Sequence, residues 1–293
     1  MLQAPNHDKQ SRLFTLPLVL FLILFLGFPL VADLVYSVSR VTFENLRSPE
    51  LQGFKNFVDV VNDPLFWKAT HFSFKFGFVT ALIECSLGLF LAVYLAPLLK
   101  KHPWLMAVLM MPMMAAPALV GLMYRLVLHE FVGPVPFYLW DWFGDSPAFL
   151  DANNAIYTLM TIEILQWTPF AVLLFHVAYQ AIPEDVRKAA TLDGAHGLTL
   201  FWHIELPFMK LALFTALFVR FIDGFRVFDN VYVLTGSGAG GSTTSLSIYV
   251  YLAFFKQGNI GKAVAASMLL LFVTFAVLFA LNFFSSKKKG ALQ

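Results

Sequence analysis

The sequence predicts an all-α polytopic membrane protein with six transmembrane helices, and three observations support this fold class. Hydrophobic residues make up 59% of the 293 positions, and charged residues make up only 13%, against roughly 25% in soluble domains. The mean hydropathy is +0.72. Several apolar runs exceed the roughly 18 residues that mark a transmembrane candidate. A lipid bilayer is therefore the expected surroundings of most of the chain.

Six apolar segments are long enough to cross a hydrocarbon layer of about 30 Å at about 1.5 Å per residue. We expect spans at about 13–36, 72–99, 104–128, 155–180, 208–234 and 262–285. The first segment follows Lys9 and Arg12, just as the apolar core of a signal peptide follows a basic N-terminal region. The run is too long for a signal-peptide core and no clear cleavage site follows it, so we interpret it as a retained span.

The distribution of lysine and arginine predicts the orientation. If the N-terminus lies inside, the short inner segments hold Lys9, Arg12, Lys100, Lys101, Arg187, Lys188, Lys210 and Lys287 to Lys289. The longer outer loops hold fewer cations, and the loop at about 129–154 holds none. The positive-inside rule then places the segments 1–12 and 286–293 in the cytoplasm.

Several function classes find no support in the residue patterns. A net charge of +2 is too small to indicate nucleic-acid binding. The glycine-rich segment 236–242 lacks the Gly-Lys-Ser/Thr that places an ammonium on a phosphate, so we interpret it as an outer loop. We find no metal-ligand cluster and no nucleophile with a neighbouring base. We therefore expect no metal, no bound cofactor and no enzymatic activity in this chain. Its single cysteine, Cys85, lies in an apolar run.

A polar segment, 181–207, separates the fourth and fifth predicted spans. Pro183 suits the first turn of a helix, and the two acidic residues after it favour the positive end of the helix dipole. The sequence predicts a helix over about 183–193, ended by Gly194 in the left-handed conformation. A second helical piece over about 197–204 is predicted to end where the chain turns into the fifth span. Two small residues, Ala189 and Ala190, leave a thin helix face that another protein can approach closely.

Polar and ionisable residues inside the predicted spans form two sets. The first set shares one face of the fourth span by its i, i+3, i+4, i+7 spacing and comprises Glu163, Gln166, Trp167 and Phe170. A carboxylate, an amide and an aromatic ring suit a sugar, because polar groups bond hydroxyls and a ring covers apolar C–H faces. The alternative is helix packing, with Glu163 paired to an intramembrane cation such as Arg220. Pro169 should kink this helix.

The second set lies in the fifth span, where charges of alternating sign recur every three residues at Arg220, Asp223, Arg226 and Asp229. Each ionisable group at membrane depth costs roughly 2.5–3.5 kcal/mol, so such groups usually face a wet cavity or a bundle interior. Either a solute cavity or a structural ion ladder fits the spacing. The candidate substrate path therefore also includes Arg220, Asp223, Asp229 and the neighbouring Asn230. Lys75 and Glu84 in the second span each require a partner on another helix.

The motifs together resemble the sugar-permease branch of the binding-protein-dependent ABC importers, which includes maltose and glycerol-3-phosphate permeases. Lys188-Ala-Ala-Thr-Leu-Asp-Gly194, followed after nine residues by Ile204-Glu-Leu-Pro207, resembles the coupling loop of that family. The similarity covers nearly the whole chain. Its further motifs are Gly53-x-x-Asn56-Phe57, Asp63-Pro64-x-Phe66-Trp67, Trp167-x-Pro169-Phe170 and Phe228-Asp229-x-Val-Tyr-Val-Leu-Thr235.

The resemblance implies a type I importer permease fold (MetI-like) in the bacterial inner membrane. It also implies four kinds of partner: a second related permease, two ATPase subunits that bind ATP and Mg, an external solute-binding protein, and a sugar or polyol solute moved by alternating access. The chain has no nucleotide site, so a separate ATPase would hydrolyse ATP. Mono- or disaccharides, polyols and glycerol phosphates all fit, as do hetero- and homodimeric permease pairs in which either subunit contacts the solute.

The residues that the resemblance assigns to ATPase coupling are Glu184, Lys188, Ala189, Ala190, Asp193, Gly194, Ile204, Leu206 and Pro207. Lys188 departs from the family, which usually has a glutamate there that pairs with a basic residue of the ATPase. Glu184 or Asp193 could replace that glutamate, or the ATPase could carry a complementary change. A stand-alone ion-coupled transporter or channel is the alternative class. A stand-alone transporter would not require a polar segment such as 183–207. The presence of this segment therefore favours the importer.

Overall fold

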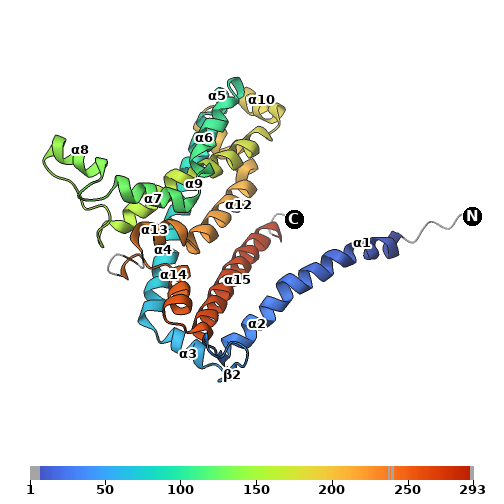
Figure 1. Cartoon of the computed structure of the whole chain (residues 1–293). Coiled ribbons are helices and arrows are strands. Elements are labelled where there is room, and N and C mark those ends of the chain that lie inside the picture. The colour runs from blue at the N-terminus through green and yellow to red at the C-terminus, as the bar shows by residue number, and fades with distance from the viewer. Residues whose placement is uncertain (1–6, 237, 239–240, 291–293) are drawn as a thin grey trace, which may run out of the picture. The chain divides into compact units, whose positions relative to one another are not determined.

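The computed structural model describes residues 7–236, 238 and 241–290, with side chains from 15 to 275 outside the same gaps (Figure 1). Most of the described chain is helical. The predicted all-helical architecture is modified only by a short antiparallel ribbon, in which β1 (Ser39–Arg40) pairs with β2 (Glu50–Leu51). The chain divides into two compact units, residues 1–64 with 250–293 and residues 65–249.

The first unit contains the two ends of the chain. Its helices are α1 (His7–Leu22), a π-helical turn (Ile23–Gly27), α2 (Phe28–Ser37), α3 (Lys55–Val61), a second π-helical turn (Leu252–Lys256) and α15 (Ile260–Gly290). Asn56 on α3 donates from Nδ2 to the carbonyls of Ser37 and Ser39 at 2.9 and 2.8 Å. Lys262 at the start of α15 binds Asp63 at 2.7 Å. These contacts fix the chain between α2 and α3, and α15 packs against both helices.

The second unit holds the polar residues of interest. Its helices are α4 (Pro64–Tyr94), α5 (Ala96–Lys101), α6 (Trp104–Met114), α7 (Pro117–Val127), α8 (Pro134–Phe143), α9 (Ala155–Gln180), α10 (Glu184–Leu192), α11 (Leu198–Leu200), a π-helical turn (Phe201–Glu205), α12 (Leu206–Phe225), α13 (Asp229–Thr235) and α14 (Leu246–Tyr251). The fourth predicted span coincides with α9, whereas α4 begins at Pro64 rather than at residue 72.

Three described helices are long and apolar enough to cross a membrane, namely Thr15–Ser37, Pro64–Tyr94 and Ala155–Gln180. A bent pair, α6 and α7, would make a fourth if it forms one span. The span predicted at 104–128 therefore corresponds to two helices that meet at 78° rather than to one straight helix. The reason is local. Ala116 precedes Pro117, whose ring disfavours helical backbone in the preceding residue, and Ala116 has an extended ψ of 132°.

The predicted fifth span, 208–234, is also interrupted, because α12 ends at Phe225 and α13 begins at Asp229. Two serines from the segment around α14 bind the carbonyls exposed by this break. Ser245 donates to the Val227 carbonyl at 2.6 Å and Ser247 donates to the Arg226 carbonyl at 2.9 Å. The break therefore has its own hydrogen-bond partners, and the expected charge ladder does not continue along one helix to Asp229.

Small residues bring α4, α9 and α12 into close contact. A Cβ added at Gly77 of α4 would lie 2.7 Å from the Phe225 backbone nitrogen, and one added at Gly224 would lie 2.8 Å from the Gly77 Cα. On the next turns of α4, a Cβ at Gly88 would lie 2.5 Å from the Ala171 Cβ of α9. Close backbone approach at small residues is typical of helix packing in membranes. In this protein it brings polar residues of the three helices together.

Candidate functional site

The centre of the second unit is a buried ion cluster around Arg220 of α12. The Nε of Arg220 donates to Glu84 of α4 at 2.6 Å, and its Nη2 donates to Glu163 of α9 at 3.1 Å. Arg220 is 1% exposed and Glu84 is fully buried. An uncompensated charge at such a depth would be costly, so the pairs hold the three helices in one arrangement. We call Arg220, Glu84, Glu163, Asp223 and Asn230 the Arg220 cluster.

Asn230 at the start of α13 extends the cluster to the broken helices. Its Nδ2 donates to Glu163 at 3.0 Å and to the Gln166 side chain at 3.2 Å. Gln166 in turn donates from Nε2 to the carbonyl of Ala115, at the break between α6 and α7, at 3.0 Å. Both interruptions in the predicted spans are thus tied to α9. The Oδ1 atom of Asn230 is buried and has no hydrogen-bond partner among the described residues.

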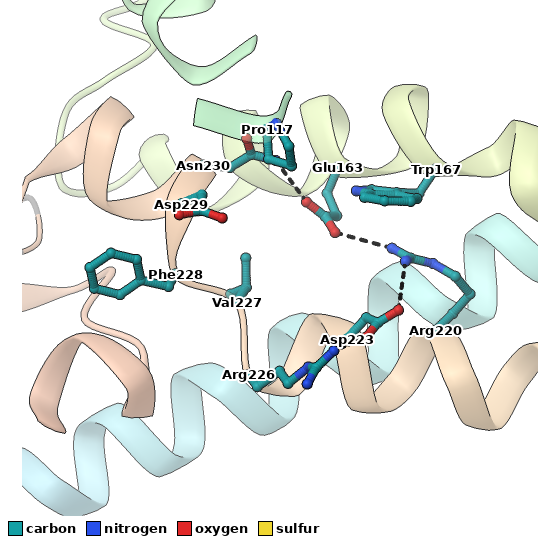
Figure 2. Close-up of a pocket in the computed structure, with 10 residues that line it drawn as sticks. All are labelled: Pro117, Glu163, Trp167, Arg220, Asp223, Arg226, Val227, Phe228, Asp229 and Asn230. Carbon is teal, nitrogen blue, oxygen red and sulfur yellow. Dashed lines mark hydrogen bonds and ion pairs between the residues drawn. The ribbon is translucent and has the colours of Figure 1, made fainter. Parts of the chain in front are cut away.

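A cavity of about 380 Å³ lies against this cluster. Its lining combines carboxylates, guanidinium groups and aromatic rings, as Figure 2 shows: Pro117, Glu163, Trp167, Arg220, Asp223, Arg226, Val227, Phe228, Asp229 and Asn230. Arg226 is occupied by Asp223 at 2.9 Å. Asp229 is exposed at the cavity wall and forms no ion pair with another described residue.

The structure separates the predicted substrate-path residues into two groups. Six of them line the cavity: Glu163, Trp167, Arg220, Asp223, Asp229 and Asn230. Gln166 lines a neighbouring, mostly apolar cavity beside α7, and Phe170 is not among the residues of the charged cavity.

The two interpretations of the intramembrane charges, a cavity and an ion cluster, are both present in the structure. Glu163 pairs with Arg220 and also faces the hollow. The Arg220 guanidinium lies 4.6 Å from the centre of the Trp167 ring. Glu84 has the partner on another helix that its depth requires, and Lys75 lies 5.9 Å from the Tyr157 ring centre.

The polar segment 181–207 contains the expected short helix, α10 (Glu184–Leu192). Gly194 follows it with φ +87°, the left-handed conformation predicted for the residue that ends the helix, and a Cβ added there would meet no atom within 4 Å beyond its chain neighbours. Asp193 is the C-terminal cap of α10. Ala189 is exposed, whereas Ala190 is 8% exposed.

Glu184, at the exposed start of α10, has two lysine neighbours. It lies 3.7 Å from Lys188 and 3.5 Å from Lys100 of α5. All three side chains are more than half exposed, so these pairs contribute little to stability.

The second half of the segment differs from the prediction. Helix α11 does not end before Leu206; it continues through the π-helical turn Phe201–Glu205 into α12, so Ile204, Leu206 and Pro207 lie in one helical run. The Leu206 N–H bonds to the Phe201 carbonyl in the wider π pattern. Pro207 explains the wide turn, because it lacks the N–H that a regular α-helix would donate four residues back.

A second arginine cluster, which the sequence analysis missed, lies at the base of α10. Arg187 donates from Nη2 to the carbonyl of Tyr179 in the last turn of α9 at 2.7 Å, and its guanidinium lies 4.0 Å from the Tyr179 ring centre. Its Nε lies 3.1 Å from a carboxylate oxygen of the buried Glu205. We call these three residues the Arg187 cluster. The available signal was Glu205 itself, an acid within an apolar run that requires a partner when buried.

Comparison with known proteins identifies the family. The model of the family described as "Binding-protein-dependent transport system inner membrane component" matches residues 84–290. The chain belongs to this family. Among curated members, the trehalose/maltose transport system permease protein MalF of Thermococcus litoralis is 32% identical over 290 residues, covering 94% of this chain and 93% of the relative. The sn-glycerol-3-phosphate transport system permease protein UgpA of Agrobacterium fabrum is 26% identical and covers 89% of each chain.

Solved structures of transporters show the same fold. A chain of a bacterial ABC transporter involved in the import of the acidic polysaccharide alginate superposes with a TM-score of 0.83 at 18% identity, over 96% of both chains. A chain of the MetNI methionine ABC transporter superposes with a TM-score of 0.55 over 76% of this chain and 97% of that one. The predicted importer permease fold is confirmed at this level. The comparisons do not establish a count of six spans.

Proposed function

We propose that this protein is the membrane-spanning subunit of an ATP-driven importer that carries a sugar or polyol across the bacterial inner membrane by alternating access. The observation that carries the proposal is the similarity to the Thermococcus litoralis trehalose/maltose permease, which extends over 94% of this chain. The charged cavity beside the Arg220 cluster supplies a polar surface inside an otherwise apolar bundle.

The importer requires partners that this chain does not contain. We propose a second permease subunit, two ATPase subunits that bind ATP and Mg, and an external protein that delivers the solute. A related transporter of the same fold has been solved together with a periplasmic protein that carries an alginate pentasaccharide. The lysine and arginine pattern favours both termini in the cytoplasm, which would place the segment 181–207 on the side where ATP is available.

We assign docking of the ATPase to the outer face of α10. Leu192 at its end is 88% exposed, and a side chain added at Gly194 beyond it would point into open space. Glu184 already has two lysine neighbours. Of the two explanations for Lys188, this arrangement favours the one in which the ATPase groove offers an acidic residue to the lysine.

We assign solute contact to the cavity beside the Arg220 cluster. The exposed carboxylate of Asp229 accepts hydrogen bonds, and sugar and polyol hydroxyls donate them. Trp167 adds an aromatic edge to the wall. Arg220 itself is occupied, because Nε, Nη1 and Nη2 all bind carboxylates of the chain. Its role in this proposal is to hold Glu163 in place at the cavity wall.

Reconstitution of the full complex in proteoliposomes tests the proposal. We expect uptake of a labelled disaccharide such as maltose or trehalose to require the external binding protein and ATP on the ATPase side. Uptake driven by an ion gradient through this chain alone would contradict the proposal and support a stand-alone secondary transporter. Co-purification of an ATPase in mild detergent is an independent check on the same distinction.

A further inference from the structure

The two arginine clusters bridge the same pair of helices at two levels. Arg220 of α12 reaches Glu163 of α9, and Arg187 of α10 contacts Tyr179 at the end of α9 and Glu205 immediately before α12. Along α9, residues 163 and 179 are about 24 Å apart, and along the antiparallel run, residues 205 and 220 are about 22 Å apart, at about 1.5 Å per residue. The two bridges are therefore separated by nearly the same length along α9 as along the run that leads into α12.

Packed apolar side chains fill the space between the two levels. Phe175 and Val172 of α9 and Met209 and Ala216 of α12 belong to one buried core, and none of the four is more than 1% exposed. Densely packed interiors transmit strain because they have little free volume to absorb it. A displacement at one end of α9 and α12 should therefore reach the other end with little loss.

Helix α10 depends on the Arg187 cluster for its own position. It has only nine residues, and Gly194 and Gly197, both with positive φ, follow it in the link to α11. Arg187 supplies a cross-link that the backbone lacks. It binds the Tyr179 carbonyl in the last turn of α9 at 2.7 Å, a carbonyl that also accepts the Ile182 N–H at 3.4 Å, and its Glu205 partner has a side chain only 6% exposed. Removing one partner of such a pair costs more than removing one partner of an exposed pair, because the remaining charge is left buried without compensation.

We propose that Arg187 is a positioning residue for energy coupling: it joins α10, α9 and α12 into one rigid body that carries a displacement of α10 to the Arg220 cluster and its cavity. The inference rests on the proposed function, since it takes the ATPase as the agent that moves α10. Without the Arg187 cluster, α10 tilts on its glycine-containing link, and ATP hydrolysis no longer moves the cavity walls.

The experiment compares solute molecules imported per ATP hydrolysed in the reconstituted complex. Allosteric coupling between sites is typically worth a factor of about 5 to 150, so we expect Arg187→Gln and Glu205→Gln to lower this ratio about fivefold or more. ATP hydrolysis itself should stay near wild type. Lys210→Gln is the matched control, because it removes an exposed cation near the same end of α12. The exchange Arg187→Glu with Glu205→Arg should restore part of the ratio by restoring the ion pair.

A distance measurement distinguishes coupling from simple loss of folding. Cys85 is the sole cysteine, so a Cys85→Ala background accepts spin labels at Leu192 of α10 and Leu211 of α12, which are 88% and 75% exposed. In the full chain in lipid nanodiscs, we expect a narrow distance distribution that Arg187→Gln broadens and Lys210→Gln leaves unchanged.

The outcomes separate the inference from the proposed function. If the wild-type complex imports solute but Arg187→Gln matches Lys210→Gln in both ratio and distance distribution, the inference is wrong and the function stands. If the wild-type complex shows no ATP-dependent uptake, the proposed function fails and the inference fails with it.

Discussion

Arg220 and Glu84, which lie 136 positions apart in the sequence, form a 2.6 Å ion pair in the interior of the helical bundle. The same guanidinium also binds Glu163 and Asp223. One cation thus holds three carboxylates from three helices. This imbalance makes the arginine more important than any one of its partners, and it determines how the cluster should respond to substitution.

We predict that Arg220→Gln destabilises the protein more than Glu84→Gln does. Removing Arg220 leaves Glu84 and Glu163 buried without a cation, and breaking a buried pair typically costs about 3–5 kcal/mol. Removing the Glu84 charge leaves Arg220 still paired to Glu163. Thermal unfolding of the purified variants in detergent measures the order. Equal midpoints, or the reverse order, would show that Arg220 does not hold the cluster together.

For Asp229→Asn, we expect weaker solute handling without loss of stability. Asp229 is exposed at the cavity wall, and a hydrogen bond to a charged group is worth about 1.5–3 kcal/mol. The KM for uptake should therefore rise about tenfold or more, with an unchanged melting temperature. Asp141→Asn on the exposed face of α8 removes the same charge elsewhere and serves as the control. An unchanged KM would remove Asp229 from the solute path.

Substitutions of Gly194 by larger residues test the docking face. We expect Gly194→Trp to lower both solute-stimulated ATP hydrolysis and uptake, because no atom of this chain lies near an added Cβ and the bulk would meet the ATPase instead. Any side chain at φ +87° is strained by about 1 kcal/mol or more. Gly194→Ala isolates that backbone cost and should be much milder. If the Gly194→Trp and Gly194→Ala variants have equal activity, backbone strain accounts for the whole effect.

Trp167 connects the ion cluster to the cavity. Trp167→Ala should lower uptake while assembly and basal ATP hydrolysis stay intact, because it removes cavity wall and the ring beside the Arg220 guanidinium. Stacking of this kind is worth about 0.5–2 kcal/mol. Trp167→Phe keeps an aromatic face and should retain more uptake. Uptake kinetics in proteoliposomes provide the readout, and wild-type kinetics in the alanine variant would exclude Trp167 from the solute path.

The sequence predicts helices well where hydrophobicity alone decides their length. Helix α9 occupies the predicted 155–180 because a predominantly apolar run of this length has no better conformation in a membrane. The break at Ala116 was also predictable in principle, since Pro117 restricts its neighbour. The break after Phe225 was not, because Ser245 and Ser247, which bind its carbonyls, follow about twenty residues later in the chain.

The candidate site was also predicted from the sequence only in part. Periodicity within one helix indicated that Glu163 and Trp167 share a face, and their depth indicated that an intramembrane cation such as Arg220 could pair with Glu163. The Arg187 cluster was missed, although both residues of its ion pair lie inside the recognised segment. Arg187 looked like one more inner cation, and its contact with Glu205, at the end of the π-helical turn before α12, depends on how α10 packs against that turn.

The full occupancy of the Arg220 guanidinium has a practical consequence for altering which solute is carried. Arg220, Glu84 and Glu163 form a scaffold in which most single changes should cost folding yield. The variation that a library can tolerate lies in Asp229, Trp167 and Phe228, which line the cavity without belonging to this scaffold. Selection for growth on a new carbon source should therefore enrich substitutions at these three positions and leave the scaffold untouched.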